Sequence, residues 1–278
     1  MNKIHYPKFD AKLTFLGGQT LTWEEEFYPD KTVFWGFYSK YIIQIKYDIK
    51  KEVLYWQTYP QQDRYDIIKK ILRFDYYFED HSKLEIDTLI SETKNIIPSP
   101  IIVLEQEFLT TAVAFIISQN NNIKRIKKII TKVRHTLGQR IFIKNKEYHL
   151  FPTHNELVSL VNSNKIYEYG LGYRSSYLID FISRYNNINT TDPVELEKQL
   201  LSVKGIGPKV CDCILVFSGV KKDTTPVDVW TKRGVKQLFN FETKNYKKMR
   251  YILSHRFKDV TYIAGQYIFE YARLAKLQ

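Results

Sequence analysis

The segment Leu200–Cys213 constrains the fold of this chain more than any other part of the sequence. It reads Leu-Leu-Ser-Val-Lys-Gly-Ile-Gly-Pro-Lys-Val-Cys-Asp-Cys, so an apolar helix end is followed by a Gly-x-Gly turn and a proline suited to starting a new helix. Such a turn leaves backbone N–H groups pointing outward near a helix N-terminus, which makes a site for an anion such as a DNA phosphate. We therefore expect two helices joined by a hairpin over about residues 192–218, with Gly205, Gly207 and Val210 donating to a phosphate.

A lysine and an aspartate follow the predicted turn. Most lysines on helices are only solvated, but Lys209 comes directly after the turn and so lies at the mouth of the predicted anion site. A neutral lysine amine can attack a sugar C1′ and form a Schiff base. Asp228, in Thr-Pro-Val-Asp, is typical of a helix N-cap, and a capping carboxylate in the same cleft could also stabilise positive charge at C1′ or accept the lysine proton. We predict that Lys209 and Asp228 are catalytic.

The charge of the chain favours a polyanionic partner. Lysine and arginine number 42 against 30 acidic residues, a net charge of +12. Nucleic acid is the first candidate and an anionic membrane surface the second. The distribution of charge along the chain supports a polyanionic partner more strongly than the net charge does. Residues 108–146 contain no acidic residue and carry a run of basic ones, which indicates a surface that binds a polyanion. The basic residues of this run are Lys124, Arg125, Lys127, Lys128, Lys132, Arg134, Arg140, Lys144 and Lys146.

The two cysteines, Cys211 and Cys213, stand two positions apart on a predicted helix, so they point to different sides and cannot easily bridge. There is no spacing typical of a disulfide framework or a zinc site. The N-terminus lacks a signal-peptide core, and no window is apolar enough for a membrane span. We expect an intracellular protein without membrane association, in the cytoplasm or nucleoid of a prokaryote, and a monomer.

Strand and helix signals divide the chain near Pro98-Ser99-Pro100. Residues from about 11 to 59 read as strands, with the clearest runs at 33–38, 41–47 and 53–56, and helices are expected at 63–74 and 86–94. Beyond the break the pattern is helical, which predicts an α+β fold with domains at 1–98 and 99–278. The expected later helices cover 101–118, 123–137, 155–163, 175–186, 192–203, 208–218, 228–239 and 262–277.

Taken together, these motifs resemble the helix-hairpin-helix DNA glycosylases with a Gly-Pro-Asp loop. The pairing of Lys209 with Asp228 is similar to the 8-oxoguanine DNA glycosylase/AP lyase branch. The resemblance implies an N-terminal antiparallel sheet domain of TATA-binding-protein-like type, followed by a two-lobed helical glycosylase body. It also implies a monovalent cation held by the carbonyls of Leu201, Val203 and Ile206, whereas no redox or divalent-metal cofactor is expected.

The resemblance extends to residues that would contact DNA. Residues 120–125, Asn-Asn-Asn-Ile-Lys-Arg, are similar to a family segment in which the first asparagine fills the space left by an extruded base and the arginine reads the orphaned cytosine. Those roles fall on Asn120 and Arg125. In a Leu-Gly-Tyr-Arg element, Tyr173 would wedge into the base stack and Arg174 would hold the cytosine.

A pocket for the damaged base is implied in the same way. The carbonyl of Gly18 would accept the N7–H that 8-oxoguanine has and guanine lacks. Cys213, one turn after the lysine, would stack on the base as a thiolate beside the ammonium, or simply be a small buried residue. Phe269 would form the opposite wall. The family commonly has a glutamine at the position of Gly265, so either Gln266 substitutes for it or the base is read more loosely.

Two further positions depart from the family pattern: Trp230 stands where a histidine is frequent, and Thr22 precedes Trp23 where an arginine is frequent. The reading that follows is a bifunctional enzyme that flips out and excises 8-oxoguanine opposite cytosine in double-stranded DNA and then cleaves the strand by β-elimination. The alternatives are a non-catalytic helix-hairpin-helix DNA-binding module and a glycosylase for alkylated or other damaged bases. An iron–sulfur glycosylase is disfavoured, because its cluster needs four cysteine ligands.

Overall fold

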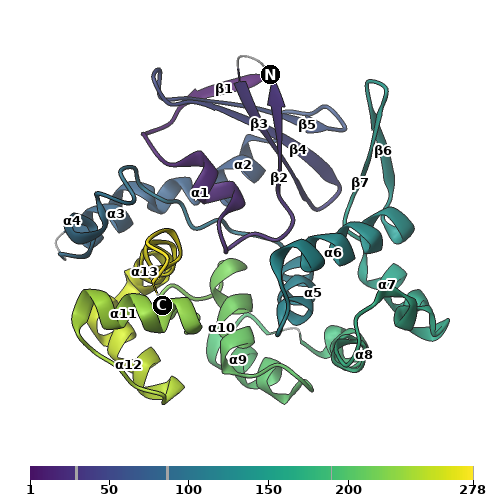
Figure 1. The fold of residues 1–278 in the computed structure, drawn as a ribbon. Coiled ribbons are helices and arrows are strands. Elements are labelled where there is room, and N and C mark those ends of the chain that lie inside the picture. Colours follow the sequence, from purple (N-terminus) through teal and green to yellow (C-terminus); the bar gives the residue numbers. More distant parts are fainter. Residues whose placement is uncertain (29–30, 86–87, 189, 278) are drawn as a thin grey trace.

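The computed structural model describes residues 1–28, 31–85, 88–188 and 190–277. An antiparallel sheet with its own short helices forms one part, and a helical body lies beneath it (Figure 1). This is the α+β architecture expected from the sequence. Within the described ranges, no helix is long and apolar enough to cross a membrane, and no group of three or more His, Cys, Asp or Glu side chains could hold a metal ion.

The sheet has five antiparallel strands in the order β1-β5-β4-β3-β2. Its alternating side chains face two different cores, as the period of two in a strand requires. Ile43 and Ile45 pack with aromatic residues of the N-terminal part, whereas Ile42 on the opposite face belongs to the core of the helical body. The strands are β1 (Asn2–His5), β2 (Glu24–Tyr28), β3 (Lys31–Tyr38), β4 (Tyr41–Asp48) and β5 (Val53–Tyr59).

Short helices accompany the sheet, and the sequence predicted them only in part. The expectation of strands from residue 11 onward was wrong at its start, because residues 11–16 form a helix capped by Asp10, whose side chain accepts from Leu13 N at 2.8 Å. The helix expected at 86–94 spans 89–93, and residues 86 and 87 lie outside the described residues. The helices are α1 (Ala11–Leu16), α2 (Tyr65–Ile71), α3 (Tyr77–Glu85) and α4 (Leu89–Thr93), with a 3₁₀ turn η1 (Phe74–Tyr76).

The helix expected over 101–118 begins only at Phe108, so the prediction was wrong for residues 101–107. These residues form no regular secondary structure, residues 101–104 are buried, and side chains from distant segments satisfy their backbone groups. The side-chain amide of Gln19 donates to Ile102 O at 2.7 Å and accepts from Leu104 N at 2.7 Å. The segment thereby ties the N-terminal part to the helical body near the predicted boundary at residue 98.

The helical body holds the turn that the sequence predicted, together with elements that it did not predict. A hairpin, β6 (Arg140–Ile143) and β7 (Lys146–His149), stands beside the sheet (Figure 1). The helices are α5 (Phe108–Ser118), α6 (Ile123–Leu137), α7 (His154–Asn162), α8 (Arg174–Arg184), α9 (Pro193–Ser202), α10 (Pro208–Phe217), α11 (Val229–Phe239), α12 (Tyr246–Phe257) and α13 (Thr261–Leu274), with 3₁₀ turns η2 (Lys165–Tyr169), η3 (Tyr185–Asn187) and η4 (Lys258–Val260).

Candidate active site

The hairpin between α9 and α10 has the conformation that its sequence predicts. Gly205 has a φ of +82°, and a Cβ atom there would lie 2.2 Å from Cγ of Tyr177, so both the backbone and the space require glycine. Gly207 caps α10, which starts at Pro208. Among the described residues, the amides of Gly205, Gly207, Lys209 and Val210 have no hydrogen-bond partner. Four amides at a helix N-terminus form a site that favours an anion.

The residues predicted for catalysis and for base binding lie around a single cavity of about 50 Å³ that opens to the surface. The chain brings these residues together from α10, from the start of α11, from α13 and from the loop after α1. The predicted residues that line it are Gly18, Lys209, Cys213, Asp228, Gln266 and Phe269.

Lys209 and Asp228 occupy defined positions on this cavity. The Lys209 side chain is partly buried, with Nζ 5.5 Å from the centroid of the Phe115 ring, and that ring stacks on Phe217. Asp228 is the N-cap of α11: its Oδ1 accepts from Thr231 N at 2.8 Å and from Thr231 Oγ1 at 3.1 Å. Capping uses only one carboxylate oxygen in these contacts, so the cap and a role in the cavity are compatible.

The thiolate expected at Cys213 is wrong for this structure. The side chain is buried, and burial raises the pKa of the thiol to about 11, although the nearby Lys209 ammonium acts in the opposite direction. The thiol is therefore neutral near pH 7. Cys213 lies on the cavity wall as a small apolar side chain, which is the plainer of the two roles considered for it.

The opposite wall is built around Glu270 and Phe269. A Cβ atom at Gly18 would lie 2.4 Å from the Phe269 ring, so only glycine allows this close approach. Glu270 Oε1 accepts from Gly18 N at 3.0 Å and from Gln266 Nε2 at 3.1 Å. Gly18 is held by its N–H, while its carbonyl accepts none of the hydrogen bonds among the described residues. The amide nitrogen of Gln266 is held by Glu270, which limits its freedom to take the place of a glutamine at 265.

The predicted DNA-contacting residues meet at the loop between α5 and α6. Asn120 is exposed and has a left-handed φ of 45°. Arg125 is exposed and donates to Gly170 O at 2.9 Å. Arg174 is buried, and its guanidinium donates to Asn120 O at 2.7 Å and stacks on Tyr173, which is 49% exposed. In this structure Arg174 therefore fixes the loop that carries Asn120, and its contact with cytosine stays a prediction.

The basic run between residues 124 and 146 is only partly a free surface. Lys127 donates to Trp23 O, Lys132 to Glu168 O, and Arg134 to His149 O. With Arg125 on Gly170 O and Lys146 on Glu26, five of the basic side chains bind the protein itself. Lys124 and Lys128 on α6 are exposed. The helix ends at Leu137, so Arg140 belongs to β6 and not to a continuous basic helix.

A comparison with family models matches residues 113–259 to the HhH-GPD superfamily base excision DNA repair protein model. This range covers the hairpin, Lys209 and Asp228. The chain belongs to the HhH-GPD superfamily.

Among curated relatives, the N-glycosylase/DNA lyase of Saccharomyces cerevisiae is 33% identical over 170 residues, which is 54% of this chain and 45% of the yeast protein. This chain therefore matches less than half the length of that relative. The probable N-glycosylase/DNA lyase of Methanothermobacter thermautotrophicus is 24% identical over 245 residues, 78% of each chain.

Two solved structures are similar over nearly the whole chain. The structure of MBOgg1 in complex with a low-affinity DNA ligand has a TM-score of 0.87 and 30% identity, covering 98% of this chain and 94% of that one. The Clostridium acetobutylicum 8-oxoguanine glycosylase/lyase, in complex with double-stranded DNA containing cytosine opposite 8-oxoG, has a TM-score of 0.84 and 27% identity, covering 97% and 93%.

The family position occupied by Gly265 has a local explanation. A Cβ atom at Gly265 would lie 1.8 Å from Oγ1 of Thr225, so a longer residue does not fit beside that threonine. At a second departure from the family pattern, Trp230 lies under the guanidinium of Arg233, whose Cζ is 4.9 Å from the ring centroid. The aromatic residue thus has a partner on its own helix.

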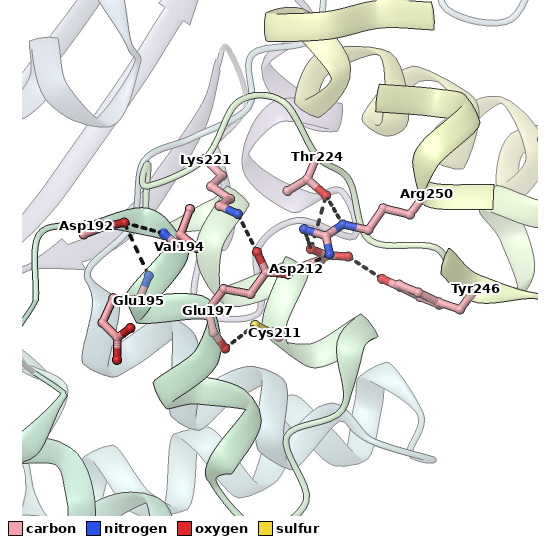
Figure 2. Close-up of polar contacts among 10 residues, drawn as sticks. All are labelled: Asp192, Val194, Glu195, Glu197, Cys211, Asp212, Lys221, Thr224, Tyr246 and Arg250. Carbon is pink, nitrogen blue, oxygen red and sulfur yellow. Dashed lines mark hydrogen bonds and ion pairs between the residues drawn. The ribbon is translucent and has the colours of Figure 1, made fainter. Parts of the chain in front are cut away.

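A partly buried ionic cluster joins α9, α10 and α12, and the sequence analysis did not predict it (Figure 2). Arg250 on α12 bonds Asp212 on α10 at 3.2 Å and Glu197 on α9 at 2.7 Å, and Lys221 also pairs with Glu197. Tyr246 donates to Asp212 Oδ2 at 2.6 Å and accepts from the amide of Val227 at 3.3 Å. The only signal in the sequence was an aspartate inside an apolar helix, which indicates a buried partner without naming it.

Proposed function

We propose that this chain is a bifunctional DNA glycosylase and abasic-site lyase that excises 8-oxoguanine paired with cytosine from double-stranded DNA. The proposal rests on one observation: the residues predicted to react with or bind the damaged base line one cavity, beside a set of unpaired amides. These residues are Lys209, Asp228, Gly18, Cys213 and Phe269. A nucleophile, a carboxylate and a pocket with an aromatic wall are what a lysine-based glycosylase needs. The names of the yeast and clostridial relatives support the same activity.

The reaction follows from the groups in the cavity. With the lesion extruded from the duplex, at a cost of a few kcal/mol, Gly18 O accepts the N7–H of the base and Phe269 packs against its face. Lys209 Nζ forms a bond to C1′ while the bond from C1′ to N9 breaks, and the base leaves with a proton. The Asp228 carboxylate stabilises the positive charge that develops on the sugar. Opening of the sugar ring gives the Schiff base, and loss of a C2′ proton then expels the 3′ phosphate.

The opposite base is assigned to Arg125, with Arg174 and Tyr173 beside it. An orphaned cytosine presents N3 and O2 as acceptors, which suit the donor fork of a guanidinium. We therefore expect faster excision opposite cytosine than opposite adenine, guanine or thymine. In Arg125→Ala the preference should shrink by about 1–3 kcal/mol, roughly five- to 150-fold. Equal excision by the wild-type protein opposite all four bases would refute this assignment.

Trapping with borohydride tests the chemistry. An 8-oxoguanine duplex should give a covalent protein–DNA adduct with the wild-type protein and none with Lys209→Gln. Lys198→Gln is the matched control, because Lys198 is an exposed lysine on α9 that does not line the cavity. Both variants should bind undamaged duplex. A wild-type protein that binds DNA but neither forms an adduct nor releases a base would instead be the non-catalytic binding module.

A panel of lesions separates the substrates. Duplexes carrying 8-oxoguanine, hypoxanthine, alkylated adenine or thymine glycol are compared at equal protein concentration. We expect 8-oxoguanine to be excised fastest. Preferred release of alkylated adenine, with little trapping, would favour the alternative of an alkylation-repair glycosylase. The monovalent cation on the carbonyls of Leu201, Val203 and Ile206 is part of the same proposal, and potassium should strengthen duplex binding if it is held there.

A further inference from the structure

We propose that the hydroxyl group of Thr225 contacts the six-membered ring of the extruded purine and helps to select which bases are excised. This inference rests on the proposed function, since it names a specificity-determining residue of the same cavity. Thr225 lies in the loop before α11, three residues from Asp228.

Thr225 is a buried polar residue on the cavity wall. Its side chain is 2% exposed, and it lines the same cavity as Lys209. Over the part of the chain that the structure describes, no hydrogen bond involves its hydroxyl. Thr225 Oγ1 is not among the fully buried side-chain atoms without a partner, so it is open to the cavity, where it can bond a ligand. A bound base would supply the missing partner.

The position of the hydroxyl fits this role. Thr225 Oγ1 lies where the Cβ atom of a longer residue at 265 would begin, because such an atom would be 1.8 Å from it. Gly265 and Phe269 are four residues apart on α13, so they follow one another along one helix face at about one turn, roughly 5.4 Å. Gly18 abuts Phe269, and Thr225 abuts Gly265.

Gly18 and Thr225 therefore mark two ends of one wall. When the imidazole edge of a purine faces Gly18, its six-membered ring extends toward Thr225. A hydroxyl can donate a hydrogen bond or accept one, so it can satisfy an oxo group or an N–H on that ring. Gln266 is a weaker candidate, because its amide nitrogen is already bonded to Glu270. The hydroxyl of Thr225 is therefore the better placed group for this contact.

The test compares Thr225→Val, which keeps the shape and removes the hydroxyl, with Thr225→Ser, which keeps the hydroxyl. Single-turnover excision of 8-oxoguanine is measured and normalised to the active sites counted by borohydride trapping on preformed abasic DNA. We expect Thr225→Val to lower the excision rate about tenfold, the loss of one hydrogen bond, and Thr225→Ser to stay within about threefold of wild type.

Thermal unfolding of the free proteins separates this role from a structural one. Because the hydroxyl has no partner in the free protein, Thr225→Val should unfold at the same temperature as wild type or slightly higher. Excision by Thr225→Val at the wild-type rate would overturn the inference, and so would a slower rate accompanied by a matching loss of stability. A wild-type protein that is trapped on abasic DNA but does not excise 8-oxoguanine would overturn the proposed substrate instead.

Discussion

Replacing Asp212 by asparagine should change how the stability of the protein depends on pH. Asp212 is 1% exposed, and burial raises the pKa of its carboxyl from 3.8 to about 6 even though Arg250, Tyr246 and Thr224 favour the ionised form. The folded pKa lies above the unfolded one, so the folded state binds the proton more tightly. The contribution of this group to stability is therefore fully present below about pH 4 and is lost as the pH rises through about 6.

The size of the effect follows from the two pKa values. A rise from 3.8 to about 6, at about 1.4 kcal/mol for each tenfold change, corresponds to a loss of about 3 kcal/mol above pH 7. About 1 kcal/mol of this has been lost by roughly pH 4.5, where the unfolded carboxyl is already mostly ionised. Between about pH 4.5 and 7.5, the wild-type protein should thus lose about 2 kcal/mol relative to Asp212→Asn, which does not titrate.

Urea unfolding of both proteins over this pH range measures the difference. The amide of Asp212→Asn also alters the bonds to Tyr246 and Arg250. This changes the free energy of unfolding by the same amount at every pH, so it does not alter the slope of that free energy with pH. Asp223→Asn controls for the loss of one negative charge, because Asp223 is exposed in the neighbouring loop. If the difference between wild type and Asp212→Asn stays constant from about pH 4.5 to 7.5, the argument from burial is refuted.

Three further predictions concern the glycines and the thiol. Gly205→Ala should lower the free energy of unfolding in urea by about 2–4 kcal/mol and weaken duplex binding, because it adds a steric clash and backbone strain at positive φ. Gly207→Ala, with open space around it, should leave stability unchanged. Equal losses of stability in the two variants would contradict this. Gly265→Ala should lower the free energy of unfolding by about 1–3 kcal/mol, because its Cβ meets Thr225 Oγ1. In a double-mutant cycle, most of this loss should disappear when Thr225→Gly is already present. Additive losses in the double mutant would show that the contact between residues 225 and 265 does not matter. Cys213 should resist iodoacetamide in the native protein near pH 7.5 and react in denaturant, as judged by mass spectrometry, and rapid native labelling would contradict a buried neutral thiol.

The parts of the site that local sequence determines were predicted well. The turn at Gly205, the start of α10 at Pro208 and the cap at Asp228 depend on neighbouring residues, so their sequence patterns were enough. The helix expected at 101–107 failed for the opposite reason. A run of apolar residues suits a buried helix or a buried extended chain, and the choice was made by the Gln19 side chain from far away in the sequence.

Other features needed the three-dimensional structure. The α12 helix was missed because its lysines, tyrosines and arginines give no clear apolar stripe, although Met249 and Leu253 are buried. The charge state of Cys213 depends on complete burial, which spacing along α10 cannot give. The close approach of Thr225 to Gly265 joins residues that are forty positions apart, and no local pattern points to it.

Under the proposed function, the site divides into a part that recognises the base and a part that carries the chemistry. Recognition is gathered on α13, where Phe269 meets Gly18 and Glu270 holds the Gly18 amide. The proposed chemistry lies on α10 and at the start of α11. Tyr246 donates to Asp212 (Figure 2) and accepts from the amide of Val227, so it joins the lysine helix to the loop that leads into Asp228. Changes on the α13 side should therefore alter which base is released while trapping on abasic DNA persists. Changes to the Asp212 link should lower both activities together, because they move the lysine and the carboxylate relative to each other.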